Sequence, residues 1–125
     1  MAVDLAFSDT GSGPSLVVLH GLFGSRRNWT TVAGRLARSH RVLTVDLRNH
    51  GESPWGEPHD YDTLAEDVAR FMHRHLDGPA AVLGHSMGGK AAMVLALSRP
   101  ELVTRLVVVD IAPAPSRPDG PWDCL

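Results

Sequence analysis

The chain has 125 residues, of which 43% are hydrophobic and 21% are charged, a composition typical of one small soluble domain. Twelve basic and fourteen acidic residues give a formal net charge of −2, which argues against a surface for nucleic acid or membrane. The single cysteine, Cys124, excludes an internal disulfide, and no apolar run reaches transmembrane length. Because residues 1–7 also lack the basic start and apolar core of a secretory signal, we expect a cytoplasmic protein.

The first part of the chain predicts two strands followed by a helix. Residues 2–8 alternate loosely and indicate an edge strand or half of a hairpin, closed by the turn-rich segment 8–14. Residues 16–19 are an uninterrupted apolar run, typical of a strand buried on both faces. The next segment has apolar residues at helical spacing that would cover one face of a sheet: Trp29, Val32, Ala33, Leu36 and Ala37.

The middle of the chain predicts another strand and a second helix. Residues 41–47 form the strand, and a loop follows it. Thr63 with Glu66 indicates a capping box, which would begin the helix. The helix carries an apolar stripe that consists of Leu64, Val68, Phe71, Met72 and Leu76.

The remaining elements continue the alternation. Residues 80–83 predict a short buried strand, residues 87–98 a helix that Pro100 stops, and residues 103–110 a last strand. Strands and helices that alternate in this way predict an α/β fold, with a mostly parallel sheet, flanking helices and right-handed crossovers. We expect residues 1–112 to form this domain and residues 113–125, which are rich in proline, to form a tail.

A glycine-framed serine joins the strand at 80–83 to the helix at 87–98. Gly84-x-Ser86-x-Gly88 fits the nucleophile elbow, in which a serine occupies a tight strand-to-helix turn with strained dihedrals. The two glycines provide the clearance that such a turn needs. The N–H of Met87, at the start of the helix, could donate to an oxyanion that forms beside the Ser86 oxygen.

The same stretch also permits a phosphate-binding interpretation. Gly84-x-x-x-x-Gly89-Lys90 matches the first part of a P-loop, and residues 106–110 could be a strand that ends in a magnesium-facing carboxylate. However, Ala91 follows Lys90 where a P-loop requires Ser or Thr. Nucleotide binding is therefore a remote alternative.

Four blocks, in residues 20–25, 45–54, 84–90 and 109–113, resemble the α/β-hydrolase superfamily. Within it the chain is most similar to the branch of YbfF-type esterases and abhydrolase domain-containing protein eleven. The resemblance implies a carboxylic ester hydrolase that forms an acyl-enzyme and needs no cofactor or metal. It extends over nearly the whole chain and identifies a small-molecule ester as the expected substrate.

The resemblance also implies roles for individual residues. Ser86 is the expected nucleophile, and the N–H groups of Leu22 and Met87 are the expected oxyanion hole, with Phe23 as the alternative donor to Leu22. Asp110 matches the place of the triad acid in some members, whereas others carry the acid one strand later. His20 would shape the oxyanion loop. Phe23 and Trp55 would line part of the acyl pocket, or would have only a packing role.

The catalytic histidine is missing from this pattern. The triad order of the fold is serine, acid, histidine, yet none of the seven histidines follows Asp110. His85 adjoins Ser86, but its side chain should diverge from that of the serine, so we expect a structural role. Asp46 and Arg48 are expected to hold the shape of their loop. No set of residues has the spacing of a metal site.

The fold would also be incomplete without further strands. Ending after Asp110 would leave the strand at 103–109 as an exposed apolar edge, so we expect an amino-terminal half of a hydrolase. The missing histidine keeps two other classes open for the 125 residues: a non-catalytic truncated hydrolase, or a binding module that retains the pocket without the chemistry.

Overall fold

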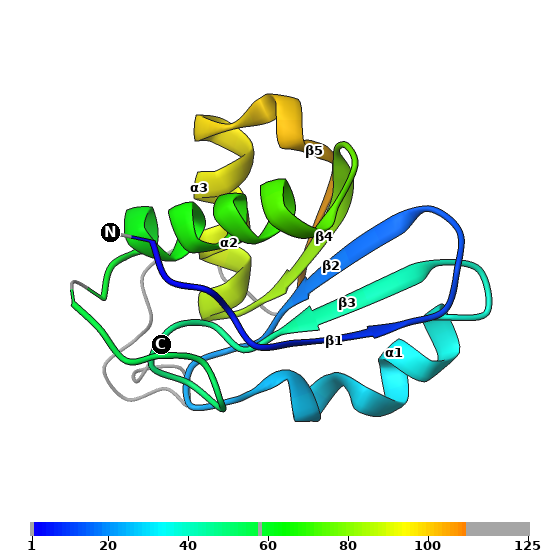
Figure 1. Cartoon of the computed structure of the whole chain (residues 1–125), viewed down its shortest axis with the longest axis horizontal. Helices are drawn as coiled ribbons and strands as arrows, with labels where there is room; N and C mark the ends of the chain where they lie inside the picture. Colours follow the sequence, from blue (N-terminus) through cyan, green and yellow to red (C-terminus); the bar gives the residue numbers. More distant parts are fainter. Residues whose placement is uncertain (1, 58, 110–125) are drawn as a thin grey trace.

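The computed structural model describes residues 2–57 and 59–109 and shows one five-stranded sheet with helices on both faces (Figure 1). The strand order is β1-β3-β2-β4-β5; β1 is antiparallel to β3, and the other pairs are parallel. The strands are β1 (Phe7–Thr10), β2 (Ser15–Leu19), β3 (Arg41–Val45), β4 (Ala80–His85) and β5 (Val103–Val109). The predicted α/β class and the mostly parallel sheet are confirmed.

The helices lie on opposite faces of the sheet, α1 on one face and α2 with α3 on the other (Figure 1). They are η1 (Arg26–Trp29), α1 (Thr30–Leu36), α2 (Tyr61–His75), α3 (Met87–Ser98) and η2 (Pro100–Leu102). No described helix is both long and apolar enough to cross a bilayer. Among the described residues, the face of the sheet under α1 is covered by α1 and by Trp29 of η1.

Two apolar cores follow from the alternation of side chains along the strands. Val17 of β2 belongs to the larger core, under α2 and α3, whereas Val18 belongs to the smaller core, under α1. Because neighbouring residues of β2 are buried on opposite faces, the prediction of a strand covered on both sides is confirmed. The carboxyl end of this central strand, and the loop that follows it, lie against the first turn of α3.

The helix α2 begins earlier than the sequence predicted. Asp60 is the N-cap, and its side chain accepts a hydrogen bond from the N–H of Thr63 at 2.8 Å. The predicted capping box of Thr63 and Glu66 is therefore wrong, since Thr63 lies inside the first turn. Glu66 instead forms an ion pair with Arg99 at 2.9 Å. The earlier start brings Tyr61 into the helix and next to the site described below.

Two smaller expectations also need correction. The first strand comprises Phe7–Thr10 rather than residues 2–8, because Phe7 and Thr10 pair with Val45 and Val42 of β3. The second concerns Val32, which is exposed instead of facing the sheet. The face that α1 presents to the smaller core is therefore narrower than predicted.

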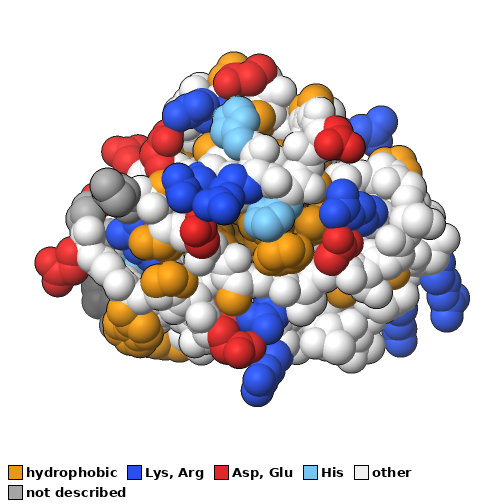
Figure 2. Space-filling model, in the orientation of Figure 1, with side chains coloured by type: hydrophobic (Ala, Val, Ile, Leu, Met, Phe, Trp, Pro, Cys, Tyr) orange, Lys and Arg blue, Asp and Glu red, His pale blue; other side chains and the backbone are white. Residues whose placement is uncertain are grey.

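The strand β5 lies at the edge of the described sheet, as predicted. It pairs with β4 on one side, and its apolar residues Leu106, Val107, Val108 and Val109 are exposed. Asp110 and the predicted tail, residues 113–125, lie outside the described residues. On the face shown in Figure 2, basic and acidic side chains are interspersed. Among the exposed ion pairs of the chain, Asp4 pairs with Arg70 and with Arg74, each at 2.8 Å.

Candidate active site

Ser86 occupies a one-residue turn between β4 and α3. Its backbone has φ 55° and ψ −116°, a left-handed region that a residue with a side chain adopts only under strain. The N–H of Ser86 donates to the carbonyl of Val109 at 3.2 Å, and its own carbonyl accepts from the N–H of Lys90 at 3.1 Å. The surrounding backbone thus holds Ser86 in the strained conformation that a nucleophile elbow requires.

The two framing glycines provide the clearance that the sequence predicted. A Cβ at Gly84 would lie 2.3 Å from the carbonyl oxygen of Gly88, so α3 could not cross β4 so closely. A Cβ at Gly88 would lie 2.4 Å from the carbonyl oxygen of Leu19 and 2.5 Å from that of His20. Both contacts are with backbone, which cannot move aside cheaply.

The phosphate-binding interpretation does not fit this geometry. A P-loop needs an open loop between its strand and its helix, to wrap a phosphate with backbone N–H groups. Here Gly84 belongs to β4, and Gly89 and Lys90 belong to α3. The Lys90 ammonium lies 5.8 Å from the centre of the Tyr61 ring. The P-loop alternative is therefore wrong.

A cavity of about 180 Å³ adjoins Ser86 and contains both predicted oxyanion residues. Its lining consists of Leu22, His59, Asp60, Tyr61, Leu64, Ser86 and Met87. Within the described residues, the N–H groups of Leu22 and Met87 have no protein acceptor. By contrast, the N–H of Phe23 donates to Nε2 of His50 at 3.2 Å. This contact favours Leu22 over Phe23 as the loop donor.

A second, more open cavity of about 480 Å³ lies beside the first and shares Leu22 and His59 with it. Phe23 and Trp55, the predicted substrate-binding residues, both line it, with 88% and 79% of their surface exposed. The structure therefore brings this pair to one cavity next to Ser86. His50 and His59 are site residues that the sequence did not identify, because nothing in the motif of their loop separates them from ordinary loop residues.

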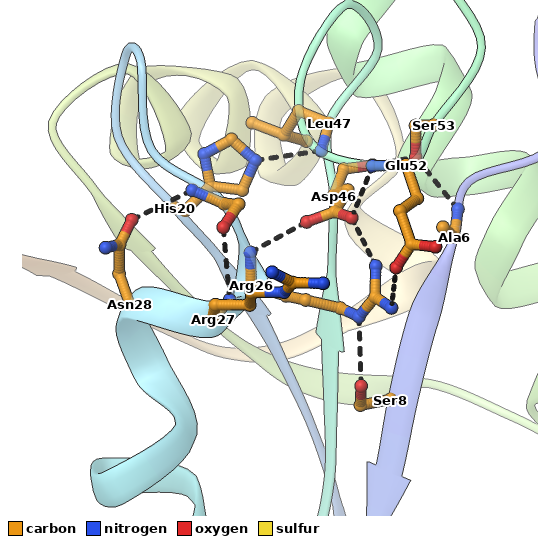
Figure 3. Close-up of polar contacts among 11 residues, drawn as sticks. Ala6, Ser8, His20, Arg26, Arg27, Asn28, Asp46, Leu47, Glu52 and Ser53 are labelled. Atoms are coloured by element: carbon orange, nitrogen blue, oxygen red, sulfur yellow. Dashed lines mark hydrogen bonds and ion pairs between the residues drawn. The ribbon is translucent and has the colours of Figure 1, made fainter.

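His20 holds the base of the loop that follows β2 (Figure 3). Its Nε2 accepts a hydrogen bond from the N–H of Leu47 at 3.0 Å, which Figure 3 shows. Its Nδ1 lies 2.7 Å from the carbonyl of Gly21. Because a carbonyl only accepts, Nδ1 carries the proton and the ring is neutral. The predicted loop-shaping role of His20 agrees with these contacts.

Asp46 fastens the far end of the same loop. Its carboxylate accepts the N–H of Arg26 at 2.7 Å and the N–H of Glu52 at 2.9 Å, and it pairs with the Arg26 guanidinium (Figure 3). The hydroxyl of Ser53 accepts the N–H of Ala6 at 2.8 Å and donates to the carbonyl of Asp46. Asp46 thus joins three segments, and its predicted structural role is confirmed.

His85 and Ser86 both lie beside Gly21, where an added Cβ would be 2.9 Å from Nδ1 of His85 and 3.3 Å from Cβ of Ser86. The His85 ring packs edge-on against Trp29, with centroids 6.0 Å apart, on the face of the sheet that α1 covers. This position supports the structural role that the sequence suggested. Among the described residues no cluster of three metal-ligating side chains occurs.

Burial of His20 predicts a pH-dependent stability. Burial lowers the pKa of His20 below its ordinary value of 6.5, so below pH 6.5 the unfolded chain binds a proton that the folded chain resists. The free energy of unfolding should fall as the pH drops below about 6.5, by at most about 1.4 kcal/mol per unit. Urea titrations from pH 5 to 8 test this. We expect a shallower slope in His20→Gln, whereas His73→Gln, on an exposed position of α2, should keep the slope of the unchanged chain.

Comparison with known proteins gives consistent matches over most of the chain. A family model described as alpha/beta hydrolase fold matches residues 14–123. The sn-1-specific diacylglycerol lipase ABHD11 of Xenopus laevis is 50% identical over 108 residues, which cover 85% of this chain and 35% of the relative. A protein of Saccharomyces cerevisiae named "Probable alcohol acetyltransferase" is 40% identical over 112 residues, 86% of this chain and 33% of the relative.

Among solved structures, a marine microorganism esterase superimposes with a TM-score of 0.90 at 39% identity. The match covers 96% of this chain and 46% of that esterase. The chain thus spans about a third of the length of these curated relatives and about half of the esterase.

Proposed function

The chain belongs to the α/β-hydrolase family, and from this premise we propose that it carries the nucleophile and the oxyanion hole of a carboxylic ester hydrolase. One observation carries the proposal: Ser86, held at φ 55° and 5% exposed, shares a cavity with the N–H-bearing residues Leu22 and Met87. Acyl transfer needs a strained serine with amides nearby that are free to donate, since the amides stabilise the oxyanion as it forms. The Leu22 and Met87 amides have no acceptor among the described residues.

In the proposed mechanism Ser86 attacks the ester carbonyl, and its proton passes to a histidine base. The carbonyl oxygen becomes an oxyanion that accepts hydrogen bonds from Leu22 and Met87. The base then protonates the leaving alcohol, and water, deprotonated by the same base, releases the acid from the acyl-enzyme. The proposed triad acid is Asp110. The sequence has no histidine after Asp110, and the triad order of the fold is serine, acid, histidine, so we propose that the base lies outside these 125 residues.

The sizes of the two cavities suggest where each part of an ester substrate would bind. The cavity next to Ser86 is small, whereas the neighbouring cavity is open and bounded by the exposed rings of Phe23 and Trp55. We propose that the larger apolar part of the ester lies against these rings, whose burial on binding is favourable. The name of the frog relative makes a glycerolipid ester the first substrate to test.

A second candidate reaction is transfer of the acyl group to an alcohol. The yeast relative is named as an alcohol acetyltransferase, and the same acyl-enzyme would serve both reactions if an alcohol replaced water in the second step. Product analysis with and without ethanol would separate ester formation from hydrolysis.

We expect a fluorophosphonate to label Ser86 of the folded 125-residue chain when imidazole supplies the base. Imidazole should increase the labelling rate by at least about tenfold, because general-base assistance contributes factors of this order or more. Mass spectrometry of peptides locates the adduct. Ser86→Ala should not label, whereas the control Ser98→Ala, at the end of α3, should label like the unchanged chain.

The remaining outcomes distinguish the alternatives. Rapid labelling without imidazole would show that a base lies within the chain, against the proposed division of the triad. A folded chain that stays unlabelled in imidazole would contradict the ester hydrolase proposal and favour a non-catalytic binding module.

A cytoplasmic location remains a prediction from the sequence.

A further inference from the structure

The loop that carries Leu22 contains a strained turn. The N–H of Gly24 donates to the carbonyl of Gly21 at 3.0 Å, which closes a four-residue turn with Leu22 and Phe23 in its centre. Phe23 has φ 61°, whereas Leu22 is not among the residues with positive φ. This is the pattern of a type II turn, whose third position favours glycine. A bulky residue there is strained and persists only if its surroundings hold it.

His50 provides the contact that holds this turn. Its Nδ1 lies 2.9 Å from the carbonyl of Arg48, which only accepts, so Nδ1 carries the proton and Nε2 is an acceptor. Nε2 receives the N–H of Phe23 at 3.2 Å. The ring is 8% exposed and lies 5.1 Å from that of His20. The carbonyl of Arg48 therefore fixes the tautomer of His50, and this tautomer lets Nε2 accept the N–H of Phe23.

The hydrogen bond from Phe23 determines the direction of the central peptide of the turn. If this peptide rotated, Phe23 could relax to a negative φ, as in a type I turn, and the strain would be lost. The acceptor on His50 opposes this rotation, because it binds the N–H only in the observed direction. It also occupies the Phe23 amide, whereas the Leu22 amide has no acceptor among the described residues, and Leu22 lines the cavity of Ser86.

We propose that His50 is a positioning residue for the oxyanion hole: it locks the strained turn at Leu22 and Phe23 so that the Leu22 N–H faces the cavity of Ser86. This inference rests on the proposed ester hydrolase function. Other contacts fasten the ends of the loop, at His20 and at Arg26. In the part of the chain that the structure describes, His50 supplies the side-chain hydrogen bond at the tip. Loss of His50 should therefore release the tip and leave the fold intact.

The test combines a structural and a chemical measurement on the 125-residue chain. Hydrogen exchange by NMR reports the Phe23 amide, and fluorophosphonate labelling of Ser86 in imidazole gives the maximal labelling rate and the half-saturating reagent concentration. In His50→Phe, which fills the space without an acceptor, we expect Phe23 exchange to accelerate at least about tenfold. The maximal labelling rate should fall about 10- to 100-fold at similar half-saturation, as for weakened oxyanion contacts.

Two further variants separate positioning from general packing. His50→Gln keeps an acceptor and a donor, so it should restore part of the labelling rate that His50→Phe loses. In a chain that carries Phe23→Gly, His50→Phe should lower the labelling rate by a smaller factor than it does in the unchanged chain, because glycine adopts a positive φ without strain. His40→Gln, whose ring contacts Ser39 at a distance from the loop, is the matched control and should behave like the unchanged chain.

Each contrary result overturns a defined step. Unchanged Phe23 exchange in His50→Phe would show that His50 does not hold the turn. Faster exchange with unchanged labelling would show that the turn does not position the oxyanion hole. If the unchanged chain fails to label in imidazole, the proposed function fails and the oxyanion role of His50 fails with it, whereas Phe23 exchange still reports the contact between the loop and His50.

Discussion

Replacing Gly88 with alanine is expected to prevent the chain from folding stably around its elbow. The added Cβ would lie 2.4 and 2.5 Å from the carbonyl oxygens of Leu19 and His20, and backbone cannot move aside as the end of a flexible side chain can. To relieve the overlap, α3 would have to move away from the carboxyl end of β2. We expect a loss of at least about 4 kcal/mol, a large share of the total stability of a typical domain. Urea denaturation followed by circular dichroism would measure it.

Gly34→Ala is the matched control for this prediction. Gly34 also lies in a helix, α1, but a Cβ there would have no neighbour within 4 Å. Alanine in such a helical position should stabilise by roughly 0.5–1 kcal/mol. A Gly88→Ala chain within about 1 kcal/mol of the unchanged chain would show that the elbow tolerates the overlap, contrary to this prediction.

The second large effect is expected at Asp67, which pairs with Arg48 in the interior. Their side chains are 0% and 1% exposed, and the guanidinium donates to the carboxylate at 2.6 and 2.9 Å. The hydrogen bonds that Arg48 donates to Asp67 raise the pKa of Arg48, so the arginine stays charged. Asp67→Asn would leave this buried charge without its counter-ion. We expect a loss of about 3–5 kcal/mol in the free energy of unfolding, measured in urea.

Two further variants test whether burial of the ion pair causes the loss of stability. Asp9→Asn breaks the pair with Arg41, whose side chains are about one-third exposed, so the loss should stay below about 1 kcal/mol. The double variant Arg48→Met with Asp67→Leu removes both charges and should recover much of the loss, although the N–H of Val3 then lacks its acceptor on Asp67. Equal losses in Asp67→Asn and Asp9→Asn would contradict the role of burial.

The pair of Arg48 and Asp67 also connects stability to the site. Arg48 lies between β3 and the loop that contains His50, and Asp67 lies on α2, whose first turn lines the cavity of Ser86. The loop and the helix are therefore joined beneath the site by a buried contact. The sequence predicted a loop-shaping role for Arg48, but its partner was identifiable only in the structure, since 19 positions separate the two residues.

The sequence by itself determined the elements whose signals are local. The run of residues 16–19 and the glycine spacing around Ser86 identified the central strand and the elbow, because burial and steric clearance are encoded at those positions themselves. The start of α2 was predicted wrongly, since Asp60 and Thr63 both have capping side chains and only backbone geometry selects between them.

The tertiary structure alone decided which loops meet and which of the described amides lack a partner among the described residues. His50 accepts a hydrogen bond from Phe23 across 27 positions, so the Phe23 amide is occupied, whereas the Leu22 amide has no acceptor among the described residues. No local pattern specifies such a contact, because it depends on how β2 and β3 align their carboxyl ends in the sheet. Ser86 could be found in the sequence, whereas the group that holds its oxyanion loop in place could be found only in the fold.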